Sequence, residues 1–269
     1  MAFEDTQAAV YLLRVSYSSV RAVHFMRTTP LSHWHSIATS FDSSVRRAFE
    51  SIVGFPLSQT AYAQACLTPK LGGFGIRRVT QHAEGAFNAC RFEVFSAWGS
   101  RLGWSSSPPP SPSQQEASFS FDTSVLSLLV SASPSPREKQ RLSSVSQPHA
   151  SAWVTAVPSA LDGPDCLIRP LAFRVACRLR LGVPVCSGGV PCVSCMHTNL
   201  DSFGDHAICC TSTGDLIVRH NRMRDLVDKF AREGQLSPVL EKKGILGESS
   251  APGRRPGDVT IPIWREGKG

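Results

Sequence analysis

Five of the nine cysteines in this 269-residue chain fall between positions 186 and 210. An odd cysteine count, with no basic, apolar secretory segment at the N-terminus, argues against a disulfide framework. Cys66, Cys90 and Cys177 lie in helical, apolar surroundings and are expected to be small core residues. The clustered cysteines need a different explanation, and shared ligation of one metal ion is the simplest.

The spacing inside this cluster is that of a metal site. Cys192 and Cys195 form a Cys-x2-Cys pair, and His206 and Cys210 follow with a His-x3-Cys spacing. Two thiolates two residues apart grip one zinc ion through a tight turn, and a second pair completes the tetrahedron. A Cys-x2-Cys pair alone fits a redox site equally well, but the downstream histidine favours zinc. We therefore predict a structural zinc ion bound by these four residues.

Neighbouring residues leave alternatives open. Cys209 competes with Cys210 for the fourth position, and His197 is a possible substitute ligand or a bystander. Asp205 is a candidate acceptor for the spare imidazole N–H of His206. The alternative to a metal site is a set of buried thiols around an ordinary loop.

Outside the cysteine cluster, the spacing of apolar residues predicts several helices. Apolar residues recur at helical spacing over 6–27, 31–53, 58–67 and 80–98, and again over Pro170–Leu181. The glycine-rich stretch PKLGGFGIRR predicts a turn and not a dinucleotide site, because no strand precedes it. The run SSSPPPSPS predicts a stiff, solvated linker within a largely disordered segment over 105–150, where Val125–Val130 forms at most a short helix.

The charge and hydropathy of the chain limit the kinds of partner that it is expected to bind. The net charge is +7, with 10 basic and 6 acidic residues in 1–104, 7 and 7 in 105–211, and 11 and 8 in 212–269. A basic surplus at both ends favours a polyanionic partner. No apolar run approaches the roughly 20 residues of a membrane span, so no membrane association is expected.

The C-terminal segment combines a basic helix with two acidic strands. A helix is predicted over 216–233, with Val218, Met223, Leu226, Val227 and Phe230 as its buried stripe. Spacing alone favours a solvated polar face for its arginines. The alternative is that three of them contact phosphates: Arg219, Arg222 and Arg224.

Two carboxylates accompany the strands that follow. Glu241 ends one predicted strand and Asp258 opens another, which runs to Trp264. Carboxylates converging from neighbouring strands bind a hard cation such as Mg²⁺, which activates water for phosphodiester cleavage. The pair is weak evidence by itself, since surface strands often carry acids.

Taken in order, the motifs CxxC, FGDHAICC, RHN and RPGDV resemble the C-terminal region of non-LTR retrotransposon polyproteins. FMRTTP, FDSSVRRAFESIVG and LGGFGIRR are similar to the segment that follows the polymerase in those elements. The resemblance implies that Cys192, Cys195, His206 and Cys210 form a CCHC zinc knuckle. It also implies nucleic-acid partners, DNA or RNA, and a nuclear location.

The resemblance further implies a restriction-like endonuclease of the PD-(D/E)XK type. Arg219, His220 and Asn221 match the motif at the start of that endonuclease. Glu241 matches its upstream acid, and Asp258 matches its metal-binding aspartate. Asp258 follows Pro-Gly, whereas the family pattern has Pro directly before the aspartate. The strand with the second acid and the lysine is expected beyond Gly269, and Lys268 is a poor substitute. No Tyr-x-Asp-Asp polymerase motif occurs.

We therefore expect a mainly α N-terminal region (1–104), a linker (105–150), a helix with a zinc knuckle (151–211) and an incomplete α/β restriction-endonuclease-like core (212–269). The expected function is nucleic-acid binding by a fragment of a retrotransposon reverse transcriptase/endonuclease polyprotein, without full catalytic activity and without a small-molecule substrate. The alternatives are a Mg²⁺-dependent endonuclease that nicks target DNA and a non-catalytic, zinc-stapled helical interaction protein. Mg²⁺ is expected only if the nuclease site is completed.

Overall fold

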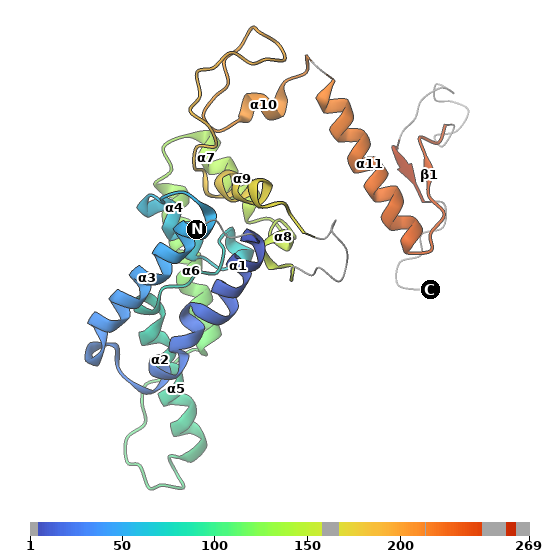
Figure 1. The fold of residues 1–269 in the computed structure, drawn as a ribbon. Helices are drawn as coiled ribbons and strands as arrows, with labels where there is room; N and C mark the ends of the chain where they lie inside the picture. Colours follow the sequence, from blue (N-terminus) through green and yellow to red (C-terminus); the bar gives the residue numbers. More distant parts are fainter. Residues whose placement is uncertain (1–4, 158–166, 213, 244–256, 262–269) are drawn as a thin grey trace. The chain divides into compact units, whose positions relative to one another are not determined.

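A computed structural model describes residues 5–157, 167–212, 214–243 and 257–261 (Figure 1). The chain divides into two compact units, 1–185 and 186–269. The boundary after residue 185 assigns the helix at 170–181 to the first unit, whereas the sequence had grouped it with the cysteine cluster. None of the described helices has the length and apolar character needed to cross a bilayer.

Unit 1 is built from helices, as predicted. Its α-helices are α1 Thr6–Leu12, α2 Val23–Thr28, α3 His35–Val53, α4 Gln59–Cys66, α5 Val79–Trp98, α6 Gln114–Ser131, α7 Pro136–Val145, α8 Ala152–Thr155 and α9 Pro170–Leu181. Helix α3 packs on both α1 and α5, and α6 packs along α5 (Figure 1). The main core lies among α1, α3, α4, α8 and α9, around Phe49, Phe74 and Phe173. A smaller core joins α2 and α5 through Met26, Val79 and Ala83.

The first predicted helix is interrupted. After α1, capped by the Asp5 side chain, the backbone runs through a π turn, Leu13–Tyr17, and a 3-10 turn, Ser19–Ala22, before α2 begins. Val10 and Leu13 are buried, but Tyr17 and Val20, which continue the same helical spacing, are exposed. The backbone leaves the helical conformation at Ser18, where the Ser18 hydroxyl donates to the Arg14 carbonyl. The apolar residues that follow therefore no longer share a face with those before it.

The glycine-rich turn between α4 and α5 is organised by one buried arginine. Arg180 from α9 donates to the carbonyl oxygens of Pro69, Gly73 and Ala150, and its guanidinium lies over the rings of Phe74 and Trp153. At Gly73 a Cβ atom would approach the Leu67 carbonyl oxygen to 2.0 Å, so only glycine fits. Burial lowers the pKa of Arg180 to about 10. The turn thus ties α9 to the rest of the unit.

Residues 114–145 differ from the predicted disordered segment, because they form α6 and α7. A capping box between Ser113 and Glu116 starts α6 directly after the Ser/Pro run. Its buried face is polar: Asp122 accepts from Arg77 (2.9 Å) and from the Thr68 N–H (3.1 Å). Apolar periodicity could not reveal a helix that docks through a carboxylate.

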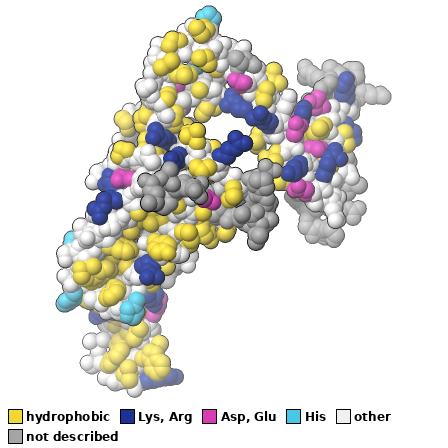
Figure 2. Space-filling model, viewed as in Figure 1, with side chains coloured by type: hydrophobic (Ala, Val, Ile, Leu, Met, Phe, Trp, Pro, Cys, Tyr) yellow, Lys and Arg dark blue, Asp and Glu magenta, His cyan; other side chains and the backbone are white. Residues whose placement is uncertain are grey.

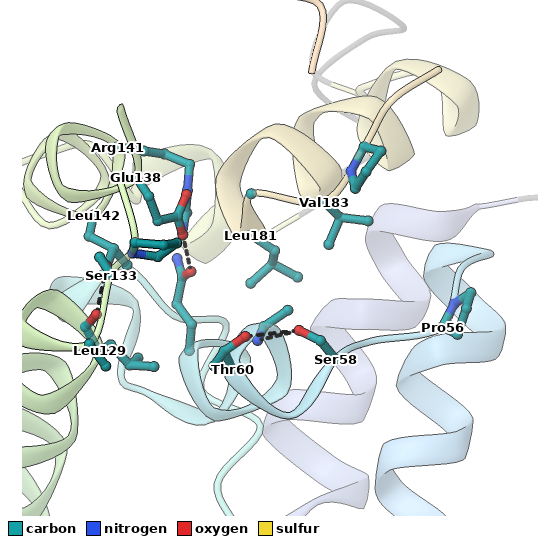
Figure 3. Close-up of a pocket in the computed structure, with 16 residues that line it drawn as sticks. Pro56, Ser58, Thr60, Leu129, Ser133, Glu138, Arg141, Leu142, Leu181 and Val183 are labelled. Carbon is teal, nitrogen blue, oxygen red and sulfur yellow. Dashed lines mark hydrogen bonds and ion pairs between the residues drawn. The ribbon is translucent and has the colours of Figure 1, made fainter. Parts of the chain in front are cut away.

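A cavity of about 310 Å³ lies between α4, the end of α6, α7 and the end of α9 (Figure 3). Its polar side chains satisfy one another: Arg141 donates to Gln64 (2.8 Å) and to Glu138, and Ser58 hydrogen bonds to Thr60 (2.9 Å). We interpret this cavity as part of the packing of α7 against α4 and α9.

Unit 2 contains a loop region, the short helix α10 (Asp205–Cys209), the long helix α11 (Asp215–Glu233) and two antiparallel strands, β1 (Val239–Leu240) and β2 (Val259–Thr260). The prediction that α11 buries an apolar stripe is wrong: Val218, Met223, Leu226, Val227 and Phe230 are all exposed. Two strands of two residues each are too small to cover the face of a 19-residue helix. No restriction-like core is evident in the part of unit 2 that the structure describes.

Candidate metal centre

Four side chains in unit 2 converge on one point. The Sγ atoms of Cys192, Cys195 and Cys210 and a ring nitrogen of His206 all lie within 4.8 Å of one another. Sγ of Cys192 is 3.9 Å from Sγ of Cys210, and Sγ of Cys195 is 3.4 Å from Nε2 of His206. A tetrahedron with zinc–sulfur bonds of about 2.3 Å has edges of about 3.8 Å. The group therefore has the size and chemistry of a four-ligand zinc site.

The first ligand pair sits at the tip of a small hairpin. The chain pairs Pro191 with Asn199 in an antiparallel bridge, and the Cys192 N–H donates to the Thr198 carbonyl (2.9 Å). The turn between them places Met196 at a positive φ of 56° and closes with the Met196 N–H donating to the Cys192 carbonyl (2.8 Å). This geometry turns both thiols of the Cys-x2-Cys pair to the same side.

The second pair is positioned by α10, and Asp201 holds that helix. One carboxylate oxygen of Asp201 accepts from the N–H groups of Phe203 and Asp205 (2.9 and 3.0 Å), and the other accepts from the His206 N–H (2.7 Å). The Cys210 N–H donates to the His206 carbonyl (2.8 Å), which brings the two ligands to one face. The sequence had not singled out Asp201; its position four residues before α10 is the signal that was available.

Backbone hydrogen bonds in the cluster favour the thiolate forms of the Cys-x2-Cys pair. The N–H groups of Cys195 and Ser194 lower the pKa of the Cys192 thiol to about 6. Those of His197 and Thr198 lower the pKa of Cys195, and the thiols of Cys192 and Cys195 raise the pKa of His206. Thiolates are the metal-binding form of cysteine. The backbone N–H groups thus lower the cost of forming the two thiolates, whereas His206 has to lose its proton to bind a metal.

The structure also places the alternatives. Cys210 is buried in the cluster, whereas Cys209 is exposed and lies outside it. The group of four does not include the His197 side chain; only the backbone of His197 contributes. The hydrogen bond proposed between Asp205 and the His206 ring stays a prediction.

A second polar cluster joins α11 to the strand pair. Arg224 donates to Glu241 (2.6 Å), and Nε2 of His220 lies 3.3 Å from an Asp258 carboxylate oxygen. The Glu241 N–H donates to the Asp258 carbonyl (2.9 Å), so the strands bring the two predicted acids together. Each carboxylate faces a cationic or titratable side chain of α11. Arg224 and His220 therefore occupy the place where Mg²⁺ was expected only if the nuclease site were completed.

The other residues of the predicted nucleic-acid surface lie elsewhere on α11. Arg222 is exposed, whereas Arg219 and Asn221 are half-buried. The Arg219 guanidinium donates to the carbonyl of Ile208 in α10. Arg219 thus links the helix that carries His206 to α11, a structural role that the sequence did not indicate.

Comparison with known proteins gives one informative similarity. The chain is 36% identical over 64 residues to the retrotransposable element SLACS 132 kDa protein of Trypanosoma brucei gambiense. The matched segment covers 24% of this chain and 5% of that protein. This similarity indicates a relation to retrotransposon proteins. No protein-family model and no solved structure matches the chain.

Proposed function

We propose that the chain is a nucleic-acid-binding part of a retrotransposon-related protein, built around a structural zinc ion bound by Cys192, Cys195, His206 and Cys210. The observation that carries the proposal is the convergence of these four ligand atoms within 4.8 Å. The similarity to a retrotransposon protein supports the proposed relation to retrotransposons.

Zinc fits this donor set better than harder cations do. Three thiols and one imidazole are soft and borderline ligands, whereas Mg²⁺ and Ca²⁺ prefer oxygen. All four positions are filled by protein, which is typical of structural and not catalytic zinc. Bound zinc would join the 191–199 hairpin to α10 by four bonds.

The nucleic-acid partner is inferred from charge. The chain has a formal net charge of +7, and Arg222 is exposed on α11. Phosphate contacts by such residues release counterions, so binding should weaken steeply with salt. We propose DNA or RNA as the ligand and, by the resemblance to retrotransposon polyproteins, the nucleus as its location.

Catalysis is the second candidate function, favoured by the β1–β2 pairing that brings Glu241 beside Asp258. Against it, Arg224 and His220 already contact these carboxylates. A cation bound there would have to displace them. We therefore propose binding without cleavage, with endonuclease activity and a non-catalytic interaction protein as the alternatives.

The test measures binding of fluorescein-labelled DNA and RNA by anisotropy from 50 to 200 mM salt, roughly the range over which phosphate contacts weaken. We expect Arg222→Gln to weaken binding and to lower the slope against log salt by about one. Arg232→Gln is the control, because Arg232 lies on the same helix but is paired with Asp228 (2.8 Å).

Two outcomes would contradict the proposal. Binding that is absent at 50 mM salt would favour the interaction protein. Mg²⁺-dependent cleavage that is abolished by Asp258→Asn would establish the endonuclease instead.

A further inference from the structure

The C-terminal end of α5 exposes an unusual amount of aromatic surface. Trp98 is 50% exposed and Trp104 47% exposed, and Leu102 between them is 58% exposed. Figure 2 shows hydrophobic side chains gathered at this end of unit 1, at the bottom of the view. Two tryptophans half in water within seven residues call for an explanation beyond the packing of this unit, because soluble proteins rarely expose contiguous apolar patches.

A tight turn after α5 brings Trp104 back onto the helix. The Gly99 N–H donates to the Phe95 carbonyl (2.7 Å) and the Trp104 N–H donates to the Gly99 carbonyl (3.0 Å). Gly103, at a φ of 68°, lets the chain reverse. Trp104 thereby comes to lie on Phe95, with ring centroids 5.9 Å apart and planes inclined by 31°. The outer surface of this pair is a preformed aromatic face.

Arginines surround the aromatic face. Arg101 lies over the Trp98 ring (5.3 Å) and Arg91 over the Phe87 ring (5.6 Å). Phe87, Arg91, Phe95 and Trp104 help to line a hollow of about 630 Å³. Its lining includes two arginines, Arg27 among them, and no carboxylate side chain.

Only one of the three arginines at this end of α5 is paired with a carboxylate in the described part of the chain. Arg27 forms an ion pair with Glu93 (2.7 Å). Among the described residues, neither Arg91 nor Arg101 has a carboxylate within ion-pair distance; both lie over aromatic rings. A ligand that is planar in one part and anionic in another would satisfy the rings and the guanidinium groups together.

We infer that the aromatic and arginine side chains at the end of α5, from Phe87 to Trp104, form a stacking platform for single-stranded nucleic acid. A base would stack on Trp104 and the adjoining phosphates would contact Arg91 and Arg101. Stacking on aromatic side chains with arginine contacts to the backbone is how sequence-tolerant single-strand binding is achieved. A duplex, whose bases are already stacked on each other, would gain little. The inference rests on the proposed function, to which it adds a second binding surface and a preference for single strands.

The experiment uses the full chain and fluorescein-labelled oligo-dT and oligo-U of about 15 nucleotides, a length within the range that single-strand-binding domains cover. A duplex of equal length is measured beside them. The informative variant is Trp104→Ala, and Arg91→Gln tests the charge separately. Leu102→Ala is the matched control, because it removes exposed apolar surface from the same turn without removing a ring. Trp104→Phe retains a ring at the position.

We expect Trp104→Ala to weaken single-strand binding roughly tenfold, the usual effect of removing one stacking side chain. Trp104→Phe should recover most of this loss, and Leu102→Ala should bind as the unchanged chain does. All these positions are exposed or half-buried, so thermal unfolding curves should coincide.

Four results would overturn the inference. Normal single-strand binding by Trp104→Ala, or equal affinity for the duplex, would remove the platform and leave the proposed function intact. Failure of the unchanged chain to bind any of the three oligonucleotides would overturn both. Self-association that depends on Trp104, seen by sedimentation without oligonucleotide, would show that a second copy of the chain covers this face.

Discussion

Unit 1 buries large apolar side chains, whereas the described part of unit 2 buries few. Phe49, Phe74 and Phe173 are at most 1% exposed, but Phe230 on α11 is 58% exposed. Two of the side chains that unit 2 does bury, Cys192 and Cys210, belong to the candidate metal centre. The two units therefore depend on different interactions.

The difference follows from the amount of apolar surface that each unit can cover. Below about 40 residues a chain seldom folds without disulfides, metals or a partner. The loop region around the cysteine cluster is of that size, and its cysteines are free. Unit 1 is large enough to be stable through its apolar core. The effect of metal binding on unit 2 and the effect of core packing on unit 1 should therefore be measurable separately.

The largest effect is expected from metal removal. Because ligation of structural zinc contributes about 10 kcal/mol to folding in small domains, chelation should abolish protection of residues 186–210 in hydrogen exchange. Protection of α3 and α5 should stay unchanged. Loss of protection throughout the chain would show that the units are not independent.

A smaller but still large effect is expected from Phe74→Ala. This ring is fully buried and packs against Phe49 and Trp153, so its removal should cost unit 1 about 3 to 5 kcal/mol. Urea unfolding followed by far-ultraviolet circular dichroism measures the change. Phe119→Ala is the matched control, because Phe119 is 49% exposed, and it should cost less than about 1 kcal/mol. Equal costs would place Phe74 outside the stabilising core.

A pH effect on the stability of unit 1 is expected from His82. Burial lowers the pKa of His82 to about 4, and its ring lies between Ser118 (3.2 Å) and the Asp122 carboxylate (3.7 Å), which Arg77 also contacts. Between pH 6.5 and 4 the unfolded chain binds more protons, so stability should fall as pH falls, by about 3 kcal/mol at most.

Urea unfolding at pH 7 and pH 5 measures this dependence. His82→Gln, which cannot titrate, should flatten the slope. An unchanged slope in that variant would assign the pH dependence to other groups.

A modest effect is expected at Asp201, which holds α10 through three backbone N–H groups. Asp201→Ala should weaken zinc binding roughly tenfold, as loss of groups that support metal ligands commonly does. Asp201→Asn keeps an acceptor oxygen and should lose less. A competition titration with a chromophoric chelator measures both, and identical affinities in all three proteins would remove Asp201 from the account.

Local patterns predicted several parts of this structure. Helices α3, α5, α9 and α11 were predicted close to their bounds because their apolar residues recur at helical spacing. The four residues of the metal centre were proposed from spacing alone, and the structure brings them together.

Long-range polar contacts could not be predicted in the same way. Asp42 on α3 accepts from the N–H groups of Val79 and Thr80 and thereby caps α5 across 37 positions. Helix α6 packs against α5 and the glycine-rich turn through Ser118 and Asp122. Because these residues are polar, the helix shows no apolar periodicity in the sequence. The prediction of a buried stripe on α11 failed for the opposite reason. Its periodicity predicts a buried face, but the stripe is exposed, and the two strands among the described residues of this segment are only two residues long.

The most direct test of the central claim is the zinc content of the chain and of two single variants, by native mass spectrometry. Cys209 and Cys210 are adjacent, yet only Cys210 lies in the cluster. We predict one zinc ion in the unchanged chain and in Cys209→Ser, and loss or marked weakening of zinc binding in Cys210→Ser. A folded chain without zinc, or equal loss in the two variants, would contradict the account.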